Sequence, residues 1–468
     1  MSWASEELAA VDLGDARRNR RLVRIVEDLS SHPSASVPQA SRDPAALQGL
    51  YDFWANPRIR ARDILAGHQQ SVIARSRKQK TVLALQDTSE LDYSAHRKST
   101  RGIGSLSNPE ARGLKLHTVL ATSDTGVPLG ILHQQMWSRS PSRGIPKERR
   151  QRLLEDKESV RWRDSLEISQ SLIPAEVQLI TIADREADMY ELFAHPRRLN
   201  SELLIRAAQN RKTKRSNESQ EIEPLNSAIA AAPIAGRIEL NLQRTPRRQA
   251  RRTELTIRHT QLWLQAPAHL ETPAAIEIWV ILAEEEKPPE NESAVRWLLL
   301  STLPVSDLAE ACESLRRYSQ RWEIERYFYA LKTGCRVEQL QLESGERIER
   351  AIATYSIVAW RLMWLMHTAR HHPDRPISDH LETVEWQALY LLYHRTSSLP
   401  ETIPRLGESV RWIAKLGGFI GRKSDGDPGI QTVWRGWMEL APAAVMWETM
   451  QQQQQQQSPQ QETTPPLQ

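Results

Sequence analysis

Two short apolar runs that each end in an aspartate constrain this sequence more than any other feature. The run at 81–86 (Thr-Val-Leu-Ala-Leu-Gln) is followed by Asp87, and the run at 177–183 is followed by Asp184. Apolar runs of this length are typical of buried strands. Side chains at the carboxyl ends of adjacent strands can converge, so we expect the two aspartates to lie close together at one edge of a sheet.

The segments around these runs indicate a mixed α/β fold. Two more strand-like runs, 116–121 and 129–135, flank a turn-forming Ser-Asp-Thr-Gly-Val-Pro sequence and predict a hairpin. A charged helical stretch is expected at about 147–172, and a further helix at 186–193.

A different pattern occupies residues 208–296. Strand-like alternation at 237–243, 253–265 and 276–283 is separated by Pro- and Arg-rich turns, which predicts a β-rich insertion. Another buried strand is expected at 297–305. Asp307, with Glu310 three residues later, is typical of the cap of a helix, which we expect to run to about Lys332.

A third acid, Glu325, falls on this predicted helix. Tyr318, Arg321, Glu325 and Lys332 are 3, 4 and 7 residues apart, which predicts that they share one helical face. Three carboxylates brought together have the oxygen ligands that Mg²⁺ prefers, and a pair of ions would suit in-line displacement at phosphorus. The alternatives are ordinary: an aspartate after a strand often caps the next helix, and Arg321 with Glu325 can form a simple surface pair.

Composition excludes several classes of protein. The net charge is only +4, which excludes a histone-like tail protein but not a nucleic-acid enzyme with local basic clusters. No apolar run approaches the ~18 residues of a membrane span, and the acidic start has no apolar signal region. The two cysteines cannot build a disulfide framework. We therefore expect a reduced, cytoplasmic protein with no membrane association.

The chain divides into four expected regions. Residues 1–75 indicate a helical N-terminal domain, 76–344 the α/β core with its insertion, 345–450 a helical C-terminal domain, and 451–468 a disordered Gln/Pro-rich tail. The first region carries a basic cluster that either contacts DNA phosphates or forms a solvated helix face: Arg17, Arg18, Arg20 and Arg21.

Three motifs carry a resemblance to a known family. Leu-Gln-Asp-Thr-Ser-Glu-Leu at 85–91, Ala-Asp-Arg-Glu-Ala-Asp at 183–188 and the Tyr318, Arg321, Glu325, Lys332 spacing resemble the signature set of the DDE transposases of insertion-sequence family four. Shorter matches of the Tn-five-type branch lie at 12–18, 132–134, 158–162, 296–300 and 416–419. One departure is the Leu-Lys pair at 114–115, where that branch has Trp-Trp.

The resemblance implies an RNase H-like catalytic core interrupted by a β-rich insertion. It implies that Asp87, Asp184 and Glu325 are the catalytic, metal-binding triad, with two Mg²⁺ ions per site and Mn²⁺ as a substitute. The N-terminal region would bind the ends of the mobile element, and the C-terminal region would form a homodimer that joins two ends.

Further DNA contacts are implied by the same resemblance. Tyr318, Arg321 and Lys332 would grip phosphates near the cleaved bond, which suits their hydrogen-bonding chemistry. Trp297 would stack on a flipped base, and Arg206 would lie near the DNA. As bare residues, a Trp at the start of a buried strand is more often core, and Lys332 could be an ordinary solvated helix end.

The function implied is cut-and-paste DNA transposition through a hairpin intermediate, in a cytoplasmic, nucleoid-associated bacterial protein. Two alternatives remain open. The chain could be a stand-alone RNase H-like nuclease, or a decayed transposase that acts as a DNA-binding regulator. The intact triad and the intact four-residue pattern argue against decay.

Overall fold

The computed structural model describes residues 2–95, 100–139, 158–242, 250–267, 275–422 and 425–457. The chain folds into two compact units. The first comprises Met1–Ser71, Leu91–Leu114 and Arg326–Gln468, and the second comprises Val72–Glu90 and Lys115–Glu325. Elements α5, β1, β3 and α11 run from one unit into the other.

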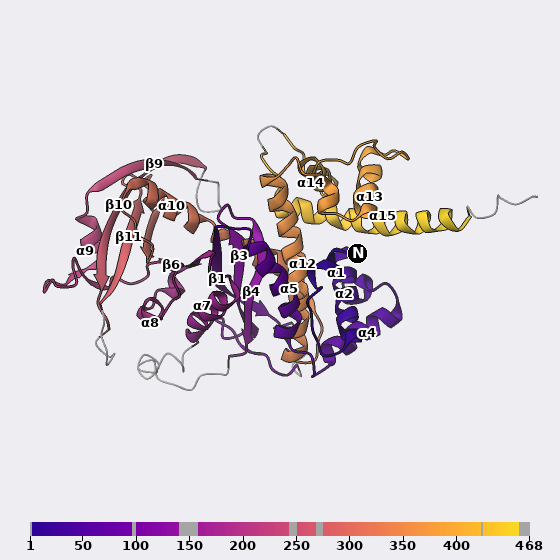
Figure 1. Cartoon of the computed structure of the whole chain (residues 1–468), viewed down its shortest axis with the longest axis horizontal. Coiled ribbons are helices and arrows are strands. Elements are labelled where there is room, and N and C mark those ends of the chain that lie inside the picture. Colours follow the sequence, from indigo (N-terminus) through magenta and orange to yellow (C-terminus); the bar gives the residue numbers. More distant parts are fainter. Residues whose placement is uncertain are drawn as a thin grey trace, which may run out of the picture. The chain divides into compact units, whose positions relative to one another are not determined.

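A large mixed sheet forms the second unit (Figure 1). Its strands follow the order β3-β1-β5-β6-β12-β11-β10-β7-β8, with β4 on β3 and β9 on β10. The strands are β1 (Thr81–Asp92), β3 (Arg112–Ser123), β4 (Pro128–Trp137), β5 (Gln178–Ala183), β6 (Ser201–Arg206), β7 (Lys212–Lys214), β8 (Glu223–Pro224), β9 (Ile234–Leu242), β10 (Arg251–Leu264), β11 (Ile276–Glu284) and β12 (Arg296–Ser301).

Parallel and antiparallel pairs both occur in this sheet. Strand β5 pairs in parallel with β1 on one side and with β6 on the other. Strands β3 and β4 form the predicted antiparallel hairpin, and β12 pairs antiparallel with both β6 and β11. The helices of this unit are α7 (Val160–Leu172), η2 (Arg185–Ala187), α8 (Tyr190–Ala194), α9 (Leu225–Ala230), α10 (Leu308–Ser319) and the start of α11 (Trp322–Tyr329). The mixed α/β prediction is therefore confirmed.

The expected β-rich stretch consists largely of long antiparallel strands. Strand β10 pairs with β11 over nine residue pairs and with β9 on its other side. Helix α9 covers this part of the sheet (Figure 1). The strands predicted at 237–243, 253–265 and 276–283 thus correspond to β9, β10 and β11.

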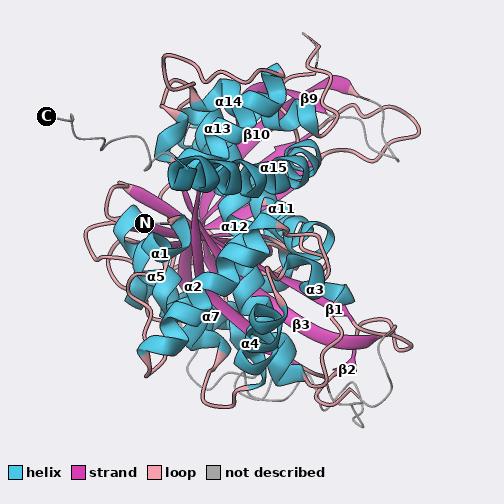
Figure 2. Cartoon of the chain, turned by 90° about the vertical axis from the view of Figure 1, so that its right-hand side faces the viewer, coloured by secondary structure: helices cyan, strands magenta, loops and turns pink. Residues whose placement is uncertain are grey.

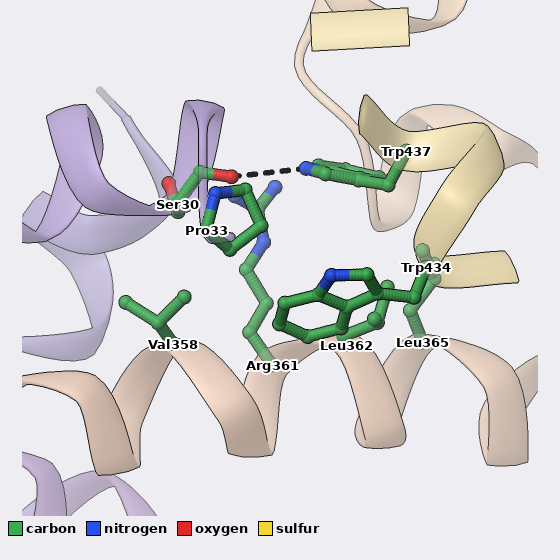
Figure 3. Close-up of a pocket in the computed structure, with 8 residues that line it drawn as sticks. All are labelled: Ser30, Pro33, Val358, Arg361, Leu362, Leu365, Trp434 and Trp437. Atoms are coloured by element: carbon green, nitrogen blue, oxygen red, sulfur yellow. Dashed lines mark hydrogen bonds between the residues drawn. The ribbon is translucent and has the colours of Figure 1, made fainter. Parts of the chain in front are cut away.

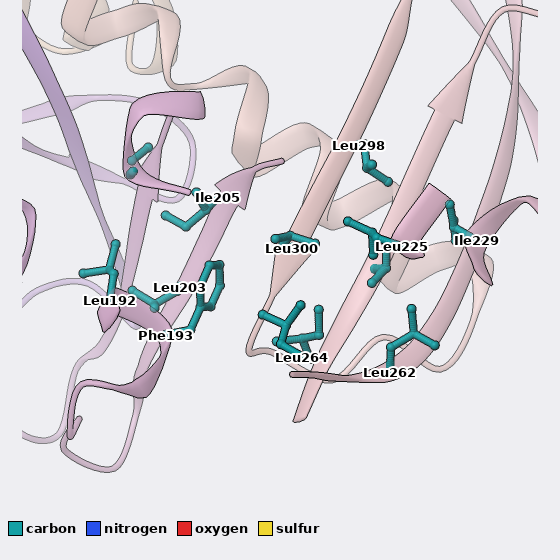
Figure 4. Packing of buried hydrophobic residues seen from close by; sticks show 14 of the residues in the cluster. Leu192, Phe193, Leu203, Ile205, Leu225, Ile229, Leu262, Leu264, Leu298 and Leu300 are labelled. Atoms are coloured by element: carbon teal, nitrogen blue, oxygen red, sulfur yellow. The ribbon is translucent and has the colours of Figure 1, made fainter. Parts of the chain in front are cut away.

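Two apolar clusters hold the second unit together. One joins β1, β3, β4 and β5 through residues such as Val82, Val119 and Leu179. The other extends from β6 and α8 across β12 to α9 and β10, and includes Phe193, Leu300 and Leu262 (Figure 4). Strands β1 and β5 are buried on both faces, which explains why their sequences are continuous apolar runs.

The first unit is almost entirely helical. Helix α12 is its centre, because most of its 27 residues are buried. Helices α13, α14 and α15 pack against one another (Figure 2). The elements are α1 (Trp3–Glu7), α2 (Ala16–Ser31), α3 (Val37–Ala40), α4 (Pro44–Ala55), α5 (Ala61–Ser76), β2 (Gly104–Ser105), η3 (Ala330–Gly334), η4 (Val337–Gln339), α12 (Gly345–His371), η5 (Ile377–Asp379), α13 (Thr383–His394), α14 (Leu406–Leu416) and α15 (Ile430–Gln457).

The N-terminal helices of this unit contact its C-terminal helices around a small apolar cavity (Figure 3). The indole of Trp437 on α15 donates to the carbonyl of Ser30 on α2 at 3.0 Å. Arg361 of α12 lines the same cavity, lies 4.0 Å from the ring centroid of Trp3 and pairs with Glu385 at 3.2 Å. A buried arginine therefore ties together segments from both ends of the chain.

The structure corrects three expectations. The helix predicted from Asp307 to Lys332 is broken: α10 ends at Ser319, α11 begins at Trp322, and a π-helical turn follows. The helix expected at 186–193 is two short pieces, η2 and α8. Gln451–Gln457 continue α15 instead of belonging to a disordered tail, as the good helix propensity of Gln allows. Residues 147–157 and 458–468 lie outside the described part.

Among the described residues, no helix is long and apolar enough to cross a membrane. Both cysteines, Cys312 and Cys335, are free thiols.

Candidate active site

Strand register places the first two acids side by side. In the parallel β1–β5 pair, Gln86 lies opposite Ala183, so Asp87 and Asp184 each follow a matched residue at the same edge of the sheet. Neighbouring strands are about 4.8 Å apart, which brings these carboxylates within electrostatic reach of each other. The convergence inferred from the two apolar runs is therefore confirmed in geometry.

Local hydrogen bonds fix each carboxylate. The amide of Thr88 donates to Asp87 Oδ1 at 2.7 Å. The amide of Glu186 donates to Asp184 Oδ1 at 2.8 Å, so Asp184 also caps the short η2 helix. The ordinary reading of Asp184 as a cap is correct, and it coexists with the position of this residue beside Asp87.

Arg321 links Asp87 to the third acid. It lies in the break between α10 and α11, and its guanidinium is largely buried. Its Nη1 is 3.2 Å from Asp87 Oδ2, and its Nη2 donates to Glu325 Oε1 at 2.6 Å. The i,i+4 pair of Arg321 and Glu325 therefore exists, but it forms part of a three-residue chain and is not a simple surface pair.

The pKa of Asp87 reflects its buried position beside other acids. Burial, and then the nearby charge of Asp184, raise the pKa of Asp87 to about 7, with a smaller contribution from Glu325. The Thr88 amide and the Arg321 guanidinium act in the opposite direction. A carboxyl group with a strongly raised pKa at a strand edge is a common mark of a functional site.

Aromatic and basic side chains surround the acids within the second unit. Tyr318, the second last residue of α10, packs edge-on against Trp297 of β12 with ring centroids 5.8 Å apart. Burial raises the pKa of Tyr318, Asp184 raises it further, and Arg321 and Arg206 oppose the rise. The structure thus brings Tyr318, Trp297 and Arg206 to the acid-bearing edge.

Tyr318 has a further property. Among the described residues, its buried hydroxyl has no hydrogen-bond partner of normal geometry. Arg206 instead donates from Nη2 to the carbonyl of Arg296 at 3.0 Å.

Lys332 belongs to the first unit. It lies in the π-helical turn η3, where its ammonium is 3.3 Å from Glu338. Its side chain is 30% exposed, so it is not the fully solvated helix end that was the alternative.

The N-terminal arginines lie on α2, which Asp15 caps. The helix buries Leu22, Ile25, Val26 and Leu29, while Arg17 and Arg20 are exposed and Arg18 and Arg21 are half-buried. Arg17 folds back on Asp15 at 3.1 Å, and Arg18 donates to the carbonyl of Leu13. Arg21 lines a groove with Arg24 and Arg42.

The chemistry of the three acids suits a divalent cation, because all their donor atoms are carboxylate oxygens. In the described part of the chain, however, no group of three His, Cys, Asp or Glu side chains lies close enough to hold a metal ion. Arg321 supplies positive charge to Asp87 and Glu325.

One residue at this edge was missed by sequence reasoning. Arg161 on α7 contacts both the residue after Asp87 and the residue two after Asp184. The only signal was its place within the motif at 158–162, because the contacts join segments far apart in the sequence.

Three family models match parts of the chain. A model described as transposase DNA-binding matches residues 1–59, a transposase DDE domain model matches 158–361, and a transposase Tn5 dimerisation domain model matches 357–454. Among solved structures, the chain is similar to the cryo-EM structure of a piggyBac transposase synaptic complex with hairpin DNA. The two share 8% identity and a TM-score of 0.36, over 79% of this chain and 72% of that chain.

The three family matches together cover residues 1–59 and 158–454. The chain therefore carries a transposase DNA-binding domain, a transposase DDE domain and a Tn5-type dimerisation domain. The match to the DDE domain model begins at residue 158 and therefore does not include Asp87. The position of Asp87 beside Asp184 follows from the pairing of β1 with β5. The chain belongs to the Tn5-like transposases and is a DNA-binding DDE transposase.

Proposed function

We propose that this chain is a cut-and-paste transposase whose catalytic triad is Asp87, Asp184 and Glu325. The observation that carries the proposal is that Asp87 and Asp184 each follow a residue of the same β1–β5 pair, with Glu325 joined to Asp87 through Arg321.

DDE transposases typically depend on divalent metal ions. Asp87, Asp184 and Glu325 would hold two Mg²⁺ ions, with Mn²⁺ as a substitute, and Glu325 would join the set by releasing Arg321. When bound, the ions would activate an attacking oxygen and stabilise the leaving oxygen at phosphorus. Burial, and then the charge of Asp184, raise the pKa of Asp87 to about 7, and a cation held there would favour the charged carboxylate.

The residues around the acids would position the DNA backbone. Arg321, once released from Glu325, has a planar fork that matches a phosphate. The hydroxyl of Tyr318 is buried beside Arg206 and Arg321 without a hydrogen bond of normal geometry among the described residues, and it would donate to a phosphate oxygen. Lys332 would add a point charge, and Arg206 a further contact.

Trp297 would receive a flipped base during hairpin formation. Its ring is half-buried against Tyr318, which leaves part of its surface accessible for stacking. Stacking offsets part of the cost of unstacking a base, typically a few kcal/mol.

The two flanking regions would assemble the complex. The basic cluster of α2, which consists of Arg17, Arg18, Arg20 and Arg21, would contact the backbone of the element's end. The C-terminal helices would pair two subunits as a homodimer, so that two ends are cut and joined together. The expected regions 1–75, 76–344 and 345–450 would have these separate roles, in a bacterial chain that works at the nucleoid.

A cleavage assay on a plasmid that carries this gene with its native flanking DNA tests the proposal. Wild type is compared with Glu325→Gln, and with Glu313→Gln as a matched control, because Glu313 is an acid on α10 that pairs with Arg316 away from the triad. We expect metal-dependent excision by wild type and Glu313→Gln only.

Other outcomes would support the two rival functions. Cleavage at scattered sites without excision would favour a nuclease. End binding without metal-dependent cleavage would favour a regulator.

A further inference from the structure

Arg161 is a largely buried arginine that makes contacts in three directions. It lies on the first turn of α7, and its side chain is 10% exposed. Its Nε donates to Thr88 Oγ1 at 3.0 Å, its Nη2 donates to Glu186 Oε2 at 2.8 Å, and its Nη1 donates to the carbonyl of Glu158 at 2.8 Å.

The first two partners are the residues that fix the acids. Thr88 follows Asp87 and donates its amide hydrogen to that carboxylate. Glu186 donates its amide hydrogen to the carboxylate of Asp184. One guanidinium therefore spans two local turns, each of which orients one acid.

We infer that Arg161 is a positioning residue that sets the spacing of Asp87 and Asp184 by holding Thr88 and Glu186 at once. The inference rests on the proposed role of the two aspartates in binding a divalent ion. The hydrogen bonds of Arg161 go to Thr88, Glu186 and Glu158 and not to either aspartate carboxylate, so it acts through its partners.

The geometry requires an arginine. A guanidinium presents donors on three nitrogens in one plane, whereas an ammonium presents all its donors from a single atom. Arg161 also lies over the rings of Trp137 and Trp162, 5.4 and 5.3 Å from their centroids, which holds the plane in place. A lysine would keep the charge and lose the simultaneous reach to Thr88 and Glu186.

Thr88 is held from a second side. Its hydroxyl is 2.9 Å from Nδ1 of His117, which is fully buried. Burial, together with the charge of Arg161, keeps the pKa of His117 well below its usual value, so the ring is neutral. Because arginine can only donate hydrogen bonds, the hydroxyl oxygen of Thr88 accepts one from Arg161. The same hydroxyl can then donate a hydrogen bond to Nδ1 of the neutral His117 ring.

A purely structural role for Arg161 makes a different prediction. The bond to the Glu158 carbonyl stabilises the start of α7, and loss of that bond would lower stability without changing ion affinity. Arg198 offers a matched control. It also donates to two main-chain carbonyls, those of Pro174 and Val177, which lie before the first residue of β5 and thus at the end opposite Asp184.

The experiment measures ion binding directly, without DNA and without activity. The full-length protein is titrated with Mn²⁺ alone, and the rise in its Tm reports ion binding to the folded state. Four proteins are compared: wild type, Asp87→Asn, Arg161→Lys and Arg198→Lys. Glu186→Gln is added because Glu186 is 63% exposed and its replacement does not threaten folding.

The midpoint of the titration is the Mn²⁺ concentration at half of the maximal rise in Tm. We expect this midpoint to increase about 10- to 100-fold in Arg161→Lys, the range seen when a partner of a metal ligand is replaced. Glu186→Gln should shift the midpoint in the same direction by less, because the bond to Thr88 remains. Arg198→Lys should lower the Tm and leave the midpoint at the wild-type value.

The outcomes separate the two hypotheses. If Asp87→Asn keeps the full Mn²⁺ response, the proposed ion site is wrong. If Asp87→Asn loses the response while Arg161→Lys and Glu186→Gln keep the wild-type midpoint, the ion site stands and the positioning role of Arg161 is wrong.

Discussion

Arg321 Nη1 lies 3.2 Å from Asp87 Oδ2, which joins a residue in a helix break to a residue of strand β1 that is 234 positions away in the sequence. Since the same guanidinium also binds Glu325, one cation neutralises two of the three acids in this structure.

The first prediction concerns Arg321→Gln. Breaking a fully buried ion pair costs about 3–5 kcal/mol, and we expect about 1–2 kcal/mol here because Glu325 is 39% exposed. The loss in unfolding free energy should be largest in chelator and smaller in saturating Mn²⁺, since a bound ion would compensate the acids. Urea unfolding in both conditions checks this, and an equal loss in both would contradict it.

The second prediction concerns Tyr318→Phe. Because the buried hydroxyl makes no hydrogen bond of normal geometry with Arg206 or Arg321, its removal should leave the Tm level or slightly higher. If the hydroxyl donates to a phosphate, cleavage should fall about 3- to 10-fold, the value of one ordinary hydrogen bond. Thermal melts and single-turnover cleavage test both parts, and unchanged cleavage would exclude the phosphate contact.

The third prediction compares two arginines of α2. Arg20 is exposed with no ion pair among the described contacts, whereas Arg17 is paired with Asp15. Replacing an arginine that contacts a phosphate lowers the slope of log affinity against log salt by about 0.9. End binding measured from low to high salt should show this change for Arg20→Gln and a smaller one for Arg17→Gln. The reverse order would assign the contact to Arg17.

The fourth prediction concerns pH and His380. Burial of the ring lowers the pKa of His380 to about 4, whereas the unfolded value is near 6.5. Unfolding therefore takes up a proton in this window, so stability is complete above pH 6.5 and declines as the pH falls toward 4. The contribution lost between pH 7.5 and pH 5 is about 2 kcal/mol.

His380→Phe keeps an aromatic ring beside Trp364, which lies 4.9 Å from the histidine. We expect urea unfolding of this variant to lose less stability than wild type over the same pH interval. Parallel losses in the two proteins would show that His380 does not titrate as its burial indicates.

The sequence located the two buried strands for a clear physical reason, because a strand buried on both faces needs a continuous apolar run. Strand β5 ends at Ala183, directly before Asp184, as expected. Strand β1 instead continues past Asp87 to Asp92, so Asp87 marks the end of the fully buried part of the strand and not the end of the strand itself. Strands β9, β10 and β11 were found through alternation, and the cap at Asp307 was found through its spacing to Glu310, which the structure shows as a 2.8 Å bond.

The break between α10 and α11 was missed because no glycine or proline marks it. Residues 318–325 keep helical spacing, and the break is visible only once Arg321 is seen to turn inward to Asp87. Arg161 was missed for a similar reason: its bond to Thr88 joins positions 73 residues apart, which no local pattern encodes.

The most direct test of the central claim is strand cleavage on a duplex that carries the native end with its flanking DNA. Wild type and Asp87→Asn are compared with Mg²⁺ and with chelator, and end binding is measured in parallel. We expect metal-dependent cleavage by wild type and a loss of more than about 100-fold in Asp87→Asn with end binding retained, which exceeds the range for replacing a neighbour of a metal ligand. Metal-dependent cleavage by Asp87→Asn at the wild-type rate would contradict it.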